Sequence, residues 1–398
     1  MESTSFTGMQ NFPRSRRHHL PYWSIVVCLF LFFAFRLLPR IDYPKVPRTS
    51  PPVSSPFSSS SSPLRYLLPD VTPREAAANA TLGFHKLLAL SARPSWRTRG
   101  LEAAANLTGL SFSIPAQPQN AEEFVRAFEQ IGAGVEGVTL PEHGAALAWV
   151  AHLDLLKHVI ASGLASAFIV EDDVDWDVRL KDQMRLVSDN VRAYTHAPAE
   201  DTAPFGSDGW DVLWLGHCDS SVDHGNDDEA PAPAPRSYRD ESRIDAALYT
   251  GWARPFVRDG IAPGHRVVQR AGRTTVCSFG FGVTRASAQK VLALLGGGGG
   301  EAFDVHLATR CREGKLRCLV VNPQVFNHYE PPADESGAAA TTTTTSLVRA
   351  GNGGEAEADE AGFEHRPGTT GNIVRSARCR ALFDRTCLRR PPDDNTAS

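Results

Sequence analysis

The chain has 398 residues, of which 42% are hydrophobic and 22% are charged, as in a globular protein of one or two domains. Its 41 lysines and arginines are outnumbered by 45 aspartates and glutamates, which gives a formal net charge of −4. There is no basic stripe interleaved with aromatic residues, so the composition argues against nucleic acid as a partner.

The chain begins with a polar tail, residues 1–20, followed by an apolar stretch, residues 21–38, that contains one charge, Arg36. The long side chain of Arg36 can reach the lipid headgroups, so this stretch is predicted to be a transmembrane signal anchor. A cleaved signal peptide is the alternative, but the small-residue cleavage pattern is missing after the apolar run. Basic residues flank the span on both sides, so charge alone does not fix its orientation. We expect a single-pass type II protein of the Golgi or endoplasmic reticulum membrane, with a cytosolic tail and a luminal body.

Composition divides the rest of the chain into four segments. Residues 39–71 are rich in proline and serine and are predicted to form an extended stem, and residues 72–329 are predicted to form the folded body. Residues 330–371 are of low complexity, with a run of threonines, and are predicted to be disordered, and residues 372–398 form a C-terminal tail.

Seven cysteines and two glycosylation triplets bear on the compartment. Cys28 lies within the predicted span, and the six others form an even set, which permits disulfides in an exported body. Two close pairs, Cys311 with Cys318 and Cys379 with Cys387, can bridge locally, although the spacing does not settle the connectivity. The triplets beginning at Asn79 and Asn106 are compatible with glycosylation.

In the folded body, strand patterns alternate with helical ones. Apolar or β-branched runs predict strands at 86–90, 167–170, 210–216, 274–284 and 316–321. Helical periodicity predicts helices at 97–106, 121–131, 144–162, 180–194, 286–295 and 303–312. The polar, proline-rich stretch at 219–244 is expected to be an insertion or loop. This alternation predicts an α/β fold with a mostly parallel sheet flanked by helices.

The most informative stretch is the strand Ala167–Val170, which is followed by five carboxylates within seven positions: Glu171, Asp172, Asp173, Asp175 and Asp177. So much negative charge at the end of a buried strand is costly unless a cation or hydrogen-bond donors receive it. Ligands of open α/β sheets bind outside the carboxyl ends of the strands, and hard divalent cations prefer oxygen ligands. The alternative is a solvated acidic turn after an edge strand.

These patterns resemble glycosyltransferase family 25, the lipopolysaccharide and collagen β-galactosyltransferase type, in a membrane-anchored form. The family's Glu-Asp-Asp-Val after a strand is present intact at 171–174, and its Asp-Val-Leu-x-Leu-Gly strand at 211–216. Looser matches are the first turn at 88–97, a middle helix at 142–152 and a late aromatic-glycine strand and helix at 278–307. The sequence departs from the family at Ser91, which stands in place of an acid, and at Ala145 and Ala148 in the middle helix.

The resemblance implies a GT-A-like (Rossmann-like) single catalytic domain that transfers a hexose, often galactose, from a UDP-sugar with inversion. The acceptor, which the sequence does not identify, would be a glycan or glycoprotein. Asp172 and Asp173 are the predicted ligands of Mn²⁺ or Mg²⁺, which stabilises the charge on departing UDP. Arg93 and Arg97, after the first strand, are placed to grip phosphate, with surface arginine as the alternative.

Four further residues have predicted roles. Asp304 is the predicted general base that deprotonates the acceptor hydroxyl, with a helix N-cap as the alternative. His152 is a second catalytic candidate through its position in the family pattern, with a core histidine as the alternative, and His328 could supply a further metal ligand. Strand alternation points Glu171 away from Asp172 and toward a basic neighbour. The remaining two acids of the run, Asp175 and Asp177, are expected to be solvated loop residues, with contact to the metal or the acceptor as the alternative.

Other functions fit the acidic run less well. The first motif of haloacid-dehalogenase phosphatases needs Thr or Val where Asp177 stands, and an EF-hand loop needs glycine where Val178 stands and glutamate where Met184 stands. A membrane-anchored, non-catalytic sugar-binding protein remains open as an alternative, and so does a phosphatase of the haloacid-dehalogenase type.

Overall fold

The computed structural model describes residues 71–218, 220–221, 233–272, 275–332 and 366–391, all within one folded unit that runs from Leu67 to Ser398. The expected cytosolic tail, membrane anchor and nearly all of the stem lie outside the described residues, as do residues 333–365 of the low-complexity segment. Among the described residues, one helix, His143–Ala161, is long and apolar enough to span a membrane. That helix is packed in the core of the unit.

The strands in chain order are β1 (Lys86–Leu90), β2 (Phe112–Ser113), β3 (Ser166–Glu171), β4 (Val174–Trp176), β5 (Val212–Gly216), β6 (Arg236–Arg239), β7 (His265–Arg270), β8 (Gly280–Thr284), β9 (Cys318–Asn322), β10 (Phe326–Glu330) and β11 (Thr369–Thr370). The helices are α2 (Pro73–Ala76), α3 (Trp96–Thr108), α4 (Glu122–Glu129), α5 (His143–Ala161), α6 (Leu180–Tyr194), η1 (Ala246–Leu248), α7 (Arg254–Asp259), α8 (Arg285–Leu295), α9 (Phe303–Arg312) and α12 (Ala377–Phe383).

The sheet has the order β2-β1-β3-β8-β5-β9-β7-β6, and it is mixed. The prediction of a mostly parallel sheet is therefore correct only in part. β1 is parallel to β2 and β3, and β5 to β9, but β8 is antiparallel to both of its neighbours, with Phe281 opposite Ile169 and Trp214. Since β8 separates two strands that run the same way, β1, β3, β5 and β9 still end at a common edge.

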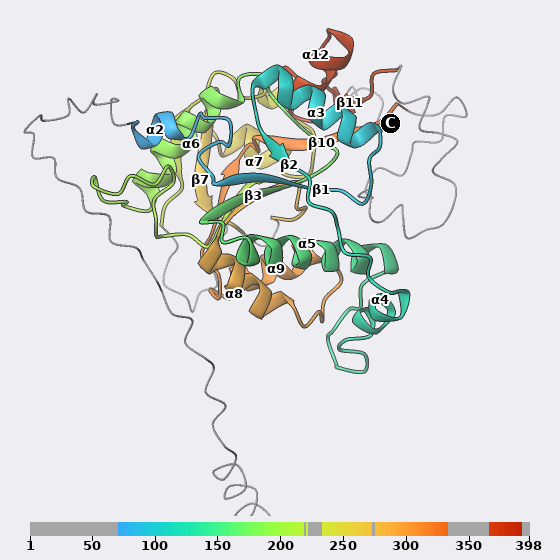
Figure 1. The fold of residues 1–398 in the computed structure, drawn as a ribbon. Helices are drawn as coiled ribbons and strands as arrows, with labels where there is room; N and C mark the ends of the chain where they lie inside the picture. The colour runs from blue at the N-terminus through green and yellow to red at the C-terminus, as the bar shows by residue number, and fades with distance from the viewer. Residues whose placement is uncertain (1–70, 219, 222–232, 273–274, 333–365, 392–398) are drawn as a thin grey trace, which may run out of the picture. The chain divides into compact units, whose positions relative to one another are not determined.

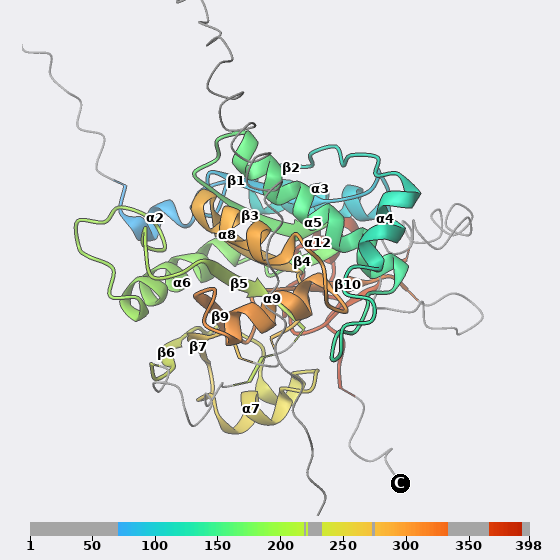
Figure 2. The same ribbon diagram turned by 90° about the horizontal axis from the view of Figure 1, so that it is seen from below.

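Helices cover both faces of this sheet and bury two apolar clusters. The helices α5, α8 and α9 lie on one face, and α3 and α6 lie on the other (Figures 1 and 2). The strands β3 and β5 are buried along both faces, which explains their continuous apolar sequences. The acidic run therefore follows a strand in the interior of the sheet, not one at its edge.

Two glycines let β8 pack in this central position. A Cβ on Gly282 would lie 2.6 Å from the ring of Phe84, and one on Gly280 would lie 2.9 Å from the ring of Phe168. The aromatic rings thus occupy the space that side chains on β8 would need. The strand is shorter than predicted, because the residues before Gly280 form a loop instead.

The C-terminal residues 366–391, which include most of the expected tail, are part of the folded unit. α12 packs against α3, and β11 pairs with β10 (Figure 1). The six cysteines of the body form three disulfides: Cys218–Cys277, Cys311–Cys318 and Cys379–Cys387. Both local bridges that the sequence allowed are thus present, and the last of them closes the segment that begins at α12.

Candidate functional site

The acids at the end of β3 are buried. Glu171 is the last residue of β3, and Asp172 and Asp173 form the turn into β4, where each is only 1% exposed. The alternative of a solvated acidic turn is therefore wrong. Buried carboxylates need positive charge or hydrogen-bond donors, and here these come from elements far away in the sequence.

Asp173 receives two basic side chains. Arg97, in the first turn of α3, donates a hydrogen bond from Nη1 to Asp173 Oδ2. His328, on β10, places its Nε2 3.1 Å from the same oxygen. Burial, followed by the charge of Arg97, lowers the pKa of His328 to about 4, so its imidazole is neutral at pH 7. The other oxygen, Asp173 Oδ1, is buried and has no hydrogen-bond partner among the described residues.

Local sequence explains why Arg97 points at this turn. Ser95 caps α3 and forms a reciprocal capping box with Thr98, which fixes the start of the helix just beyond β1. Arg97 then lies in the first turn, at the same edge as the acids. The preceding Arg93, the other predicted phosphate-binding arginine, is exposed on the turn between β1 and α3, whereas Arg97 is buried against the acids.

Asp172 is held by the side chain of Ser91. The Ser91 hydroxyl donates to Asp172 Oδ2 over 2.6 Å, and Arg97 Nη1 lies 3.8 Å from Asp172 Oδ1. An acid at position 91, as in the family that the sequence resembles, would place like charges together here. Ser91 instead supplies a hydrogen-bond donor, which the buried carboxylate of Asp172 needs.

Glu171 faces the opposite side of the sheet, as alternation along the strand predicts. Its Oε1 accepts a hydrogen bond from Ser278 Oγ over 2.9 Å and lies 3.9 Å from His152 Nε2. Burial, the largest influence, raises the pKa of Glu171 to about 7, and burial lowers the pKa of His152 to about 3. The expected basic neighbour is thus a neutral imidazole at pH 7, and the two groups do not form an ion pair.

His152 is built as a buried support. Its ring is 1% exposed and stacks on Phe303 with centroids 4.4 Å apart, and its Nε2 lies 3.2 Å from Ser278 Oγ. A hydrolytic triad would need the acid on the second ring nitrogen, but Glu171 and Ser278 both meet Nε2, and Nδ1 has no partner among the described residues. The structure therefore places His152 in the core behind Glu171, as the core-histidine alternative expects.

Asp304 lies in the first turn of α9, and the N-cap of that helix is Ala302, so the capping alternative is wrong. Its Oδ2 accepts the backbone N–H of Cys277 over 2.6 Å. Cys277 has a positive φ of 68° and is bonded to Cys218 just after β5. Asp304 is half-buried, and its charge contributes to the raised pKa of Glu171. The predicted base is therefore near the acidic edge, with one oxygen committed to the loop that carries Ser278.

The expectation that Asp175 and Asp177 are solvated is wrong, because both anchor the C-terminal segment. Asp175 Oδ2 accepts from Ser376 Oγ, and its Oδ1 accepts the N–H of Arg378 over 3.1 Å. Asp177 accepts the N–H of Arg375 over 3.1 Å. Sequence reasoning missed these partners because they lie about 200 positions further on, in a segment that was expected to be a tail.

Arg378 stabilises the acidic turn through hydrogen bonds to the backbone of the turn. This fully buried guanidinium donates from Nη2 to the carbonyl oxygens of Asp172 and Val174, and it lies over the ring of Tyr329. It fits beside Gly100, where any Cβ would lie 2.3 Å from Arg378 Nη1. Arg378 therefore holds the backbone of the turn that carries Asp173, while Arg97 and His328 contact the side chain of Asp173.

The donor set near Asp173 suits a divalent cation that shares its coordination with a substrate. Among the described residues, no group of three or more histidine, cysteine or acidic side chains is placed to hold a metal. Mg²⁺ is usually held by one or two carboxylates together with substrate phosphates. Asp173 could supply the carboxylate of such a site, and the neutral imidazole of His328 lies beside it as a second possible ligand.

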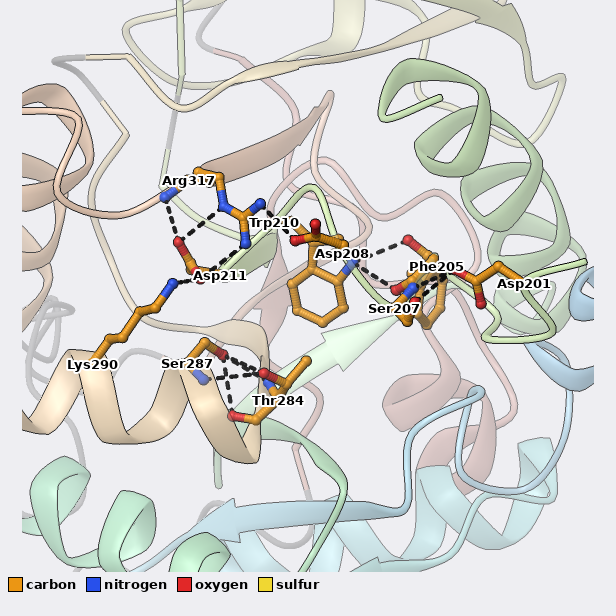
Figure 3. Close-up of polar contacts among 11 residues, drawn as sticks. Asp201, Phe205, Ser207, Asp208, Trp210, Asp211, Thr284, Ser287, Lys290 and Arg317 are labelled. Carbon is orange, nitrogen blue, oxygen red and sulfur yellow. Dashed lines mark hydrogen bonds and ion pairs between the residues drawn. The ribbon is translucent and has the colours of Figure 1, made fainter. Parts of the chain in front are cut away.

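The opposite edge of the sheet has different features. A pocket of about 560 Å³ lies there, lined by residues that include Phe84, Phe205 and Trp210, and none of the predicted site residues borders it. Nearby, Asp211 at the start of β5 is paired with Lys290 and Arg317 (Figure 3). The first residue of the Asp-Val-Leu-x-Leu-Gly motif at 211–216, Asp211, thus pairs with Lys290 and Arg317 and does not belong to the acidic edge.

No protein-family model matches this chain, and no curated protein matches it. The case for a function therefore rests on the arrangement at the end of β3.

Proposed function

We propose that this chain is a metal-dependent glycosyltransferase with a GT-A-like catalytic domain, which transfers a hexose, with galactose the first choice, from a UDP-sugar to a glycan or glycoprotein. The observation that carries the proposal is the meeting of His328 with Asp173, 155 positions apart in the sequence, at the carboxyl edge of the sheet. The imidazole of His328 is neutral at pH 7 and lies beside Asp173 Oδ2, while the other oxygen of this carboxylate, Oδ1, is buried without a partner among the described residues and is available to a cation.

The chemistry at this edge also supports the proposal. Asp172 and Asp173 are two adjacent buried carboxylates, and Arg97 contacts both of them. Hard divalent cations prefer oxygen ligands and bring substrate phosphates with them, so an acidic edge that also carries a guanidinium suits a metal-bound diphosphate.

The proposed roles follow from position. Asp173 and His328 would hold Mn²⁺ or Mg²⁺, which stabilises the negative charge of the leaving diphosphate when it is bound. Arg97 is placed to bind a phosphate oxygen, and Asp172, fixed by Ser91, keeps the turn in place. Asp304 accepts the proton as the acceptor hydroxyl attacks the anomeric carbon and the UDP–sugar bond breaks. Glu171 and His152 support the strand from its other face.

The same reasoning extends to the compartment. Three disulfides in the body are expected of a protein that folds in an oxidising lumen, and they support the proposal of a type II protein of the Golgi or endoplasmic reticulum membrane. We propose that residues 21–38 anchor the chain and that the body faces the lumen.

The test is UDP release by the purified protein with UDP-galactose, UDP-glucose and UDP-N-acetylglucosamine in the presence of Mn²⁺. We expect turnover with one donor, loss of at least 100-fold in Asp173→Asn and in His328→Ala, and retention in Asp211→Asn, a control carboxylate at the other edge of the sheet. Circular dichroism checks that each variant folds. Binding of UDP that is unchanged when the metal is chelated, measured by calorimetry, would contradict the assignment. Sugar binding without UDP release would instead favour the non-catalytic alternative.

A further inference from the structure

The sequence contains two Asn-x-Thr triplets, and the structure places them in different surroundings. Asn79-Ala80-Thr81 lies in the turns between α2 and β1. Asn106-Leu107-Thr108 forms the end of α3. Both asparagines are exposed, so exposure alone does not distinguish them. The difference lies in the local backbone, a turn for the first triplet and a helix for the second, and in the contacts of each triplet.

At the first triplet, the side chain of Asn79 is already in a defined orientation. Its Oδ1 accepts the N–H of Thr81 over 2.8 Å and the N–H of Gly83 over 3.0 Å, and it lies 3.1 Å from the Thr81 hydroxyl. Because the carbonyl oxygen is engaged on the protein side, the amide nitrogen of this exposed side chain is the atom that remains for modification. A group attached to Nδ2 leaves all three contacts of Oδ1 in place.

At both triplets the threonine hydroxyl donates to a backbone carbonyl, which for Thr81 is that of Phe84 over 2.6 Å, but at the second triplet the hydroxyl also holds a buried side chain. Thr108 Oγ1 donates to the carbonyl of Ala104 over 2.8 Å and accepts the indole N–H of Trp176 over 3.1 Å. The triplet is also helical, so the Asn106 amide and the Thr108 hydroxyl are not joined in a local turn as they are at Asn79. Opening this triplet would break the last turn of α3 and the anchoring of a fully buried tryptophan.

We propose that Asn79 is an N-glycosylation site and that Asn106 is not. In the reaction, Asn79 Nδ2 forms a bond to the anomeric carbon of an oligosaccharide carried on a lipid diphosphate. The anomeric carbon–oxygen bond breaks, the lipid diphosphate leaves with the electron pair, and the amide nitrogen loses one proton. The turn exposes the amide of Asn79 and keeps the Thr81 hydroxyl 3.1 Å from the amide oxygen, so the acceptor triplet lies in a surface turn and not in a helix.

The test uses the full chain expressed in a eukaryotic secretory cell, with tryptic peptides mapped by mass spectrometry after enzymatic deglycosylation in heavy-oxygen water. We expect the ¹⁸O-labelled aspartate that marks a former glycan at position 79 and unlabelled asparagine at position 106. This measurement needs no variant, so it stands even where a substitution harms folding.

Variants then separate the triplet from the fold. On gels, Asn79→Gln and Thr81→Ala should lose the shift that deglycosylation produces in the wild type. Thr81→Ser, which keeps the hydroxyl, and Asn106→Gln should retain it. A label at Asn106 alone, labels at both positions, or no label at either would each overturn the proposal. UDP release measured on the deglycosylated protein reports on the proposed transferase separately, so failure of one proposal does not imply failure of the other.

Discussion

The three disulfides close loops of very different length, and this leads to a quantitative prediction. Cys218 and Cys277 are 59 positions apart, whereas Cys311 and Cys318 are 7 apart. If a cross-link stabilises the fold by restricting the unfolded chain, its contribution grows with the logarithm of the loop length. This relation gives about 4.2 kcal/mol for the long loop and about 2.4 kcal/mol for the short one at 25 °C.

The comparison is between Cys218→Ala/Cys277→Ala and Cys311→Ala/Cys318→Ala, by equilibrium unfolding in urea. We expect the first variant to lose about 1.8 kcal/mol more of the free energy of unfolding than the second. Packing acts in the opposite sense, because Cys311 and Cys318 are each 3% exposed whereas the other pair is half-buried. An equal loss, or a larger one for the short loop, would refute the reasoning from chain entropy.

The long-range disulfide also has a local consequence. It holds the loop in which the N–H of Cys277 bonds to Asp304 and Ser278 bonds to Glu171. We expect hydrogen exchange at the Cys277 amide to become faster when this disulfide is removed, and to stay unchanged when the short one is removed. Protection that survives loss of the long disulfide would show that Asp304 alone holds the loop.

Two further predictions concern a buried ion pair and a glycine. Burial disfavours ionised Asp240, but Arg266, 2.6 Å away, together with nearby hydrogen bonds outweighs burial and lowers its pKa below the ordinary 3.8. Ionised Asp240 therefore stabilises the fold above pH 3.8. We expect Asp240→Asn to lower the free energy of unfolding by about 3–5 kcal/mol at pH 7, measured by urea unfolding, and by less as the pH falls below 3.8. A loss that does not change with pH would contradict this. Gly216→Ala would place a Cβ 2.6 Å from a backbone nitrogen of β8, so we expect a loss of about 1–3 kcal/mol in the same assay, against little change for Gly297→Ala, where the space is open.

Local sequence patterns were sufficient for the elements that carry strong periodicity. The predicted bounds of β1, α6 and α9 agree with the structure, and those of α3, α5 and α8 differ by one or two residues. Two signals explain this success: continuous apolar runs between turn residues and helical spacing of apolar residues. Sequence also placed the acids correctly at the end of a buried strand.

Strand direction and distant partners were not available from such patterns. Nothing within 280–284 tells whether that strand runs with or against its neighbours, so the mixed sheet was missed. Only three residues separate β10, which carries His328, from β9, and the sequence patterns did not distinguish β10 as a strand of its own. Arg378 and Ser376 find their acids across about 200 positions, and only the folded chain brings these groups together.

The acids that follow Val170 therefore have different partners, which depend on their position in the chain. Glu171 faces the α5 side and is held by neutral groups, and Asp175 and Asp177 hold the C-terminal segment. Asp173 differs from these, because it meets two basic residues and still has an oxygen without a partner among the described residues. A purely structural acid would gain nothing from that unsatisfied oxygen, since burying it costs about 1–3 kcal/mol. This is why the proposed cation site is centred on Asp173, although five acids follow the strand.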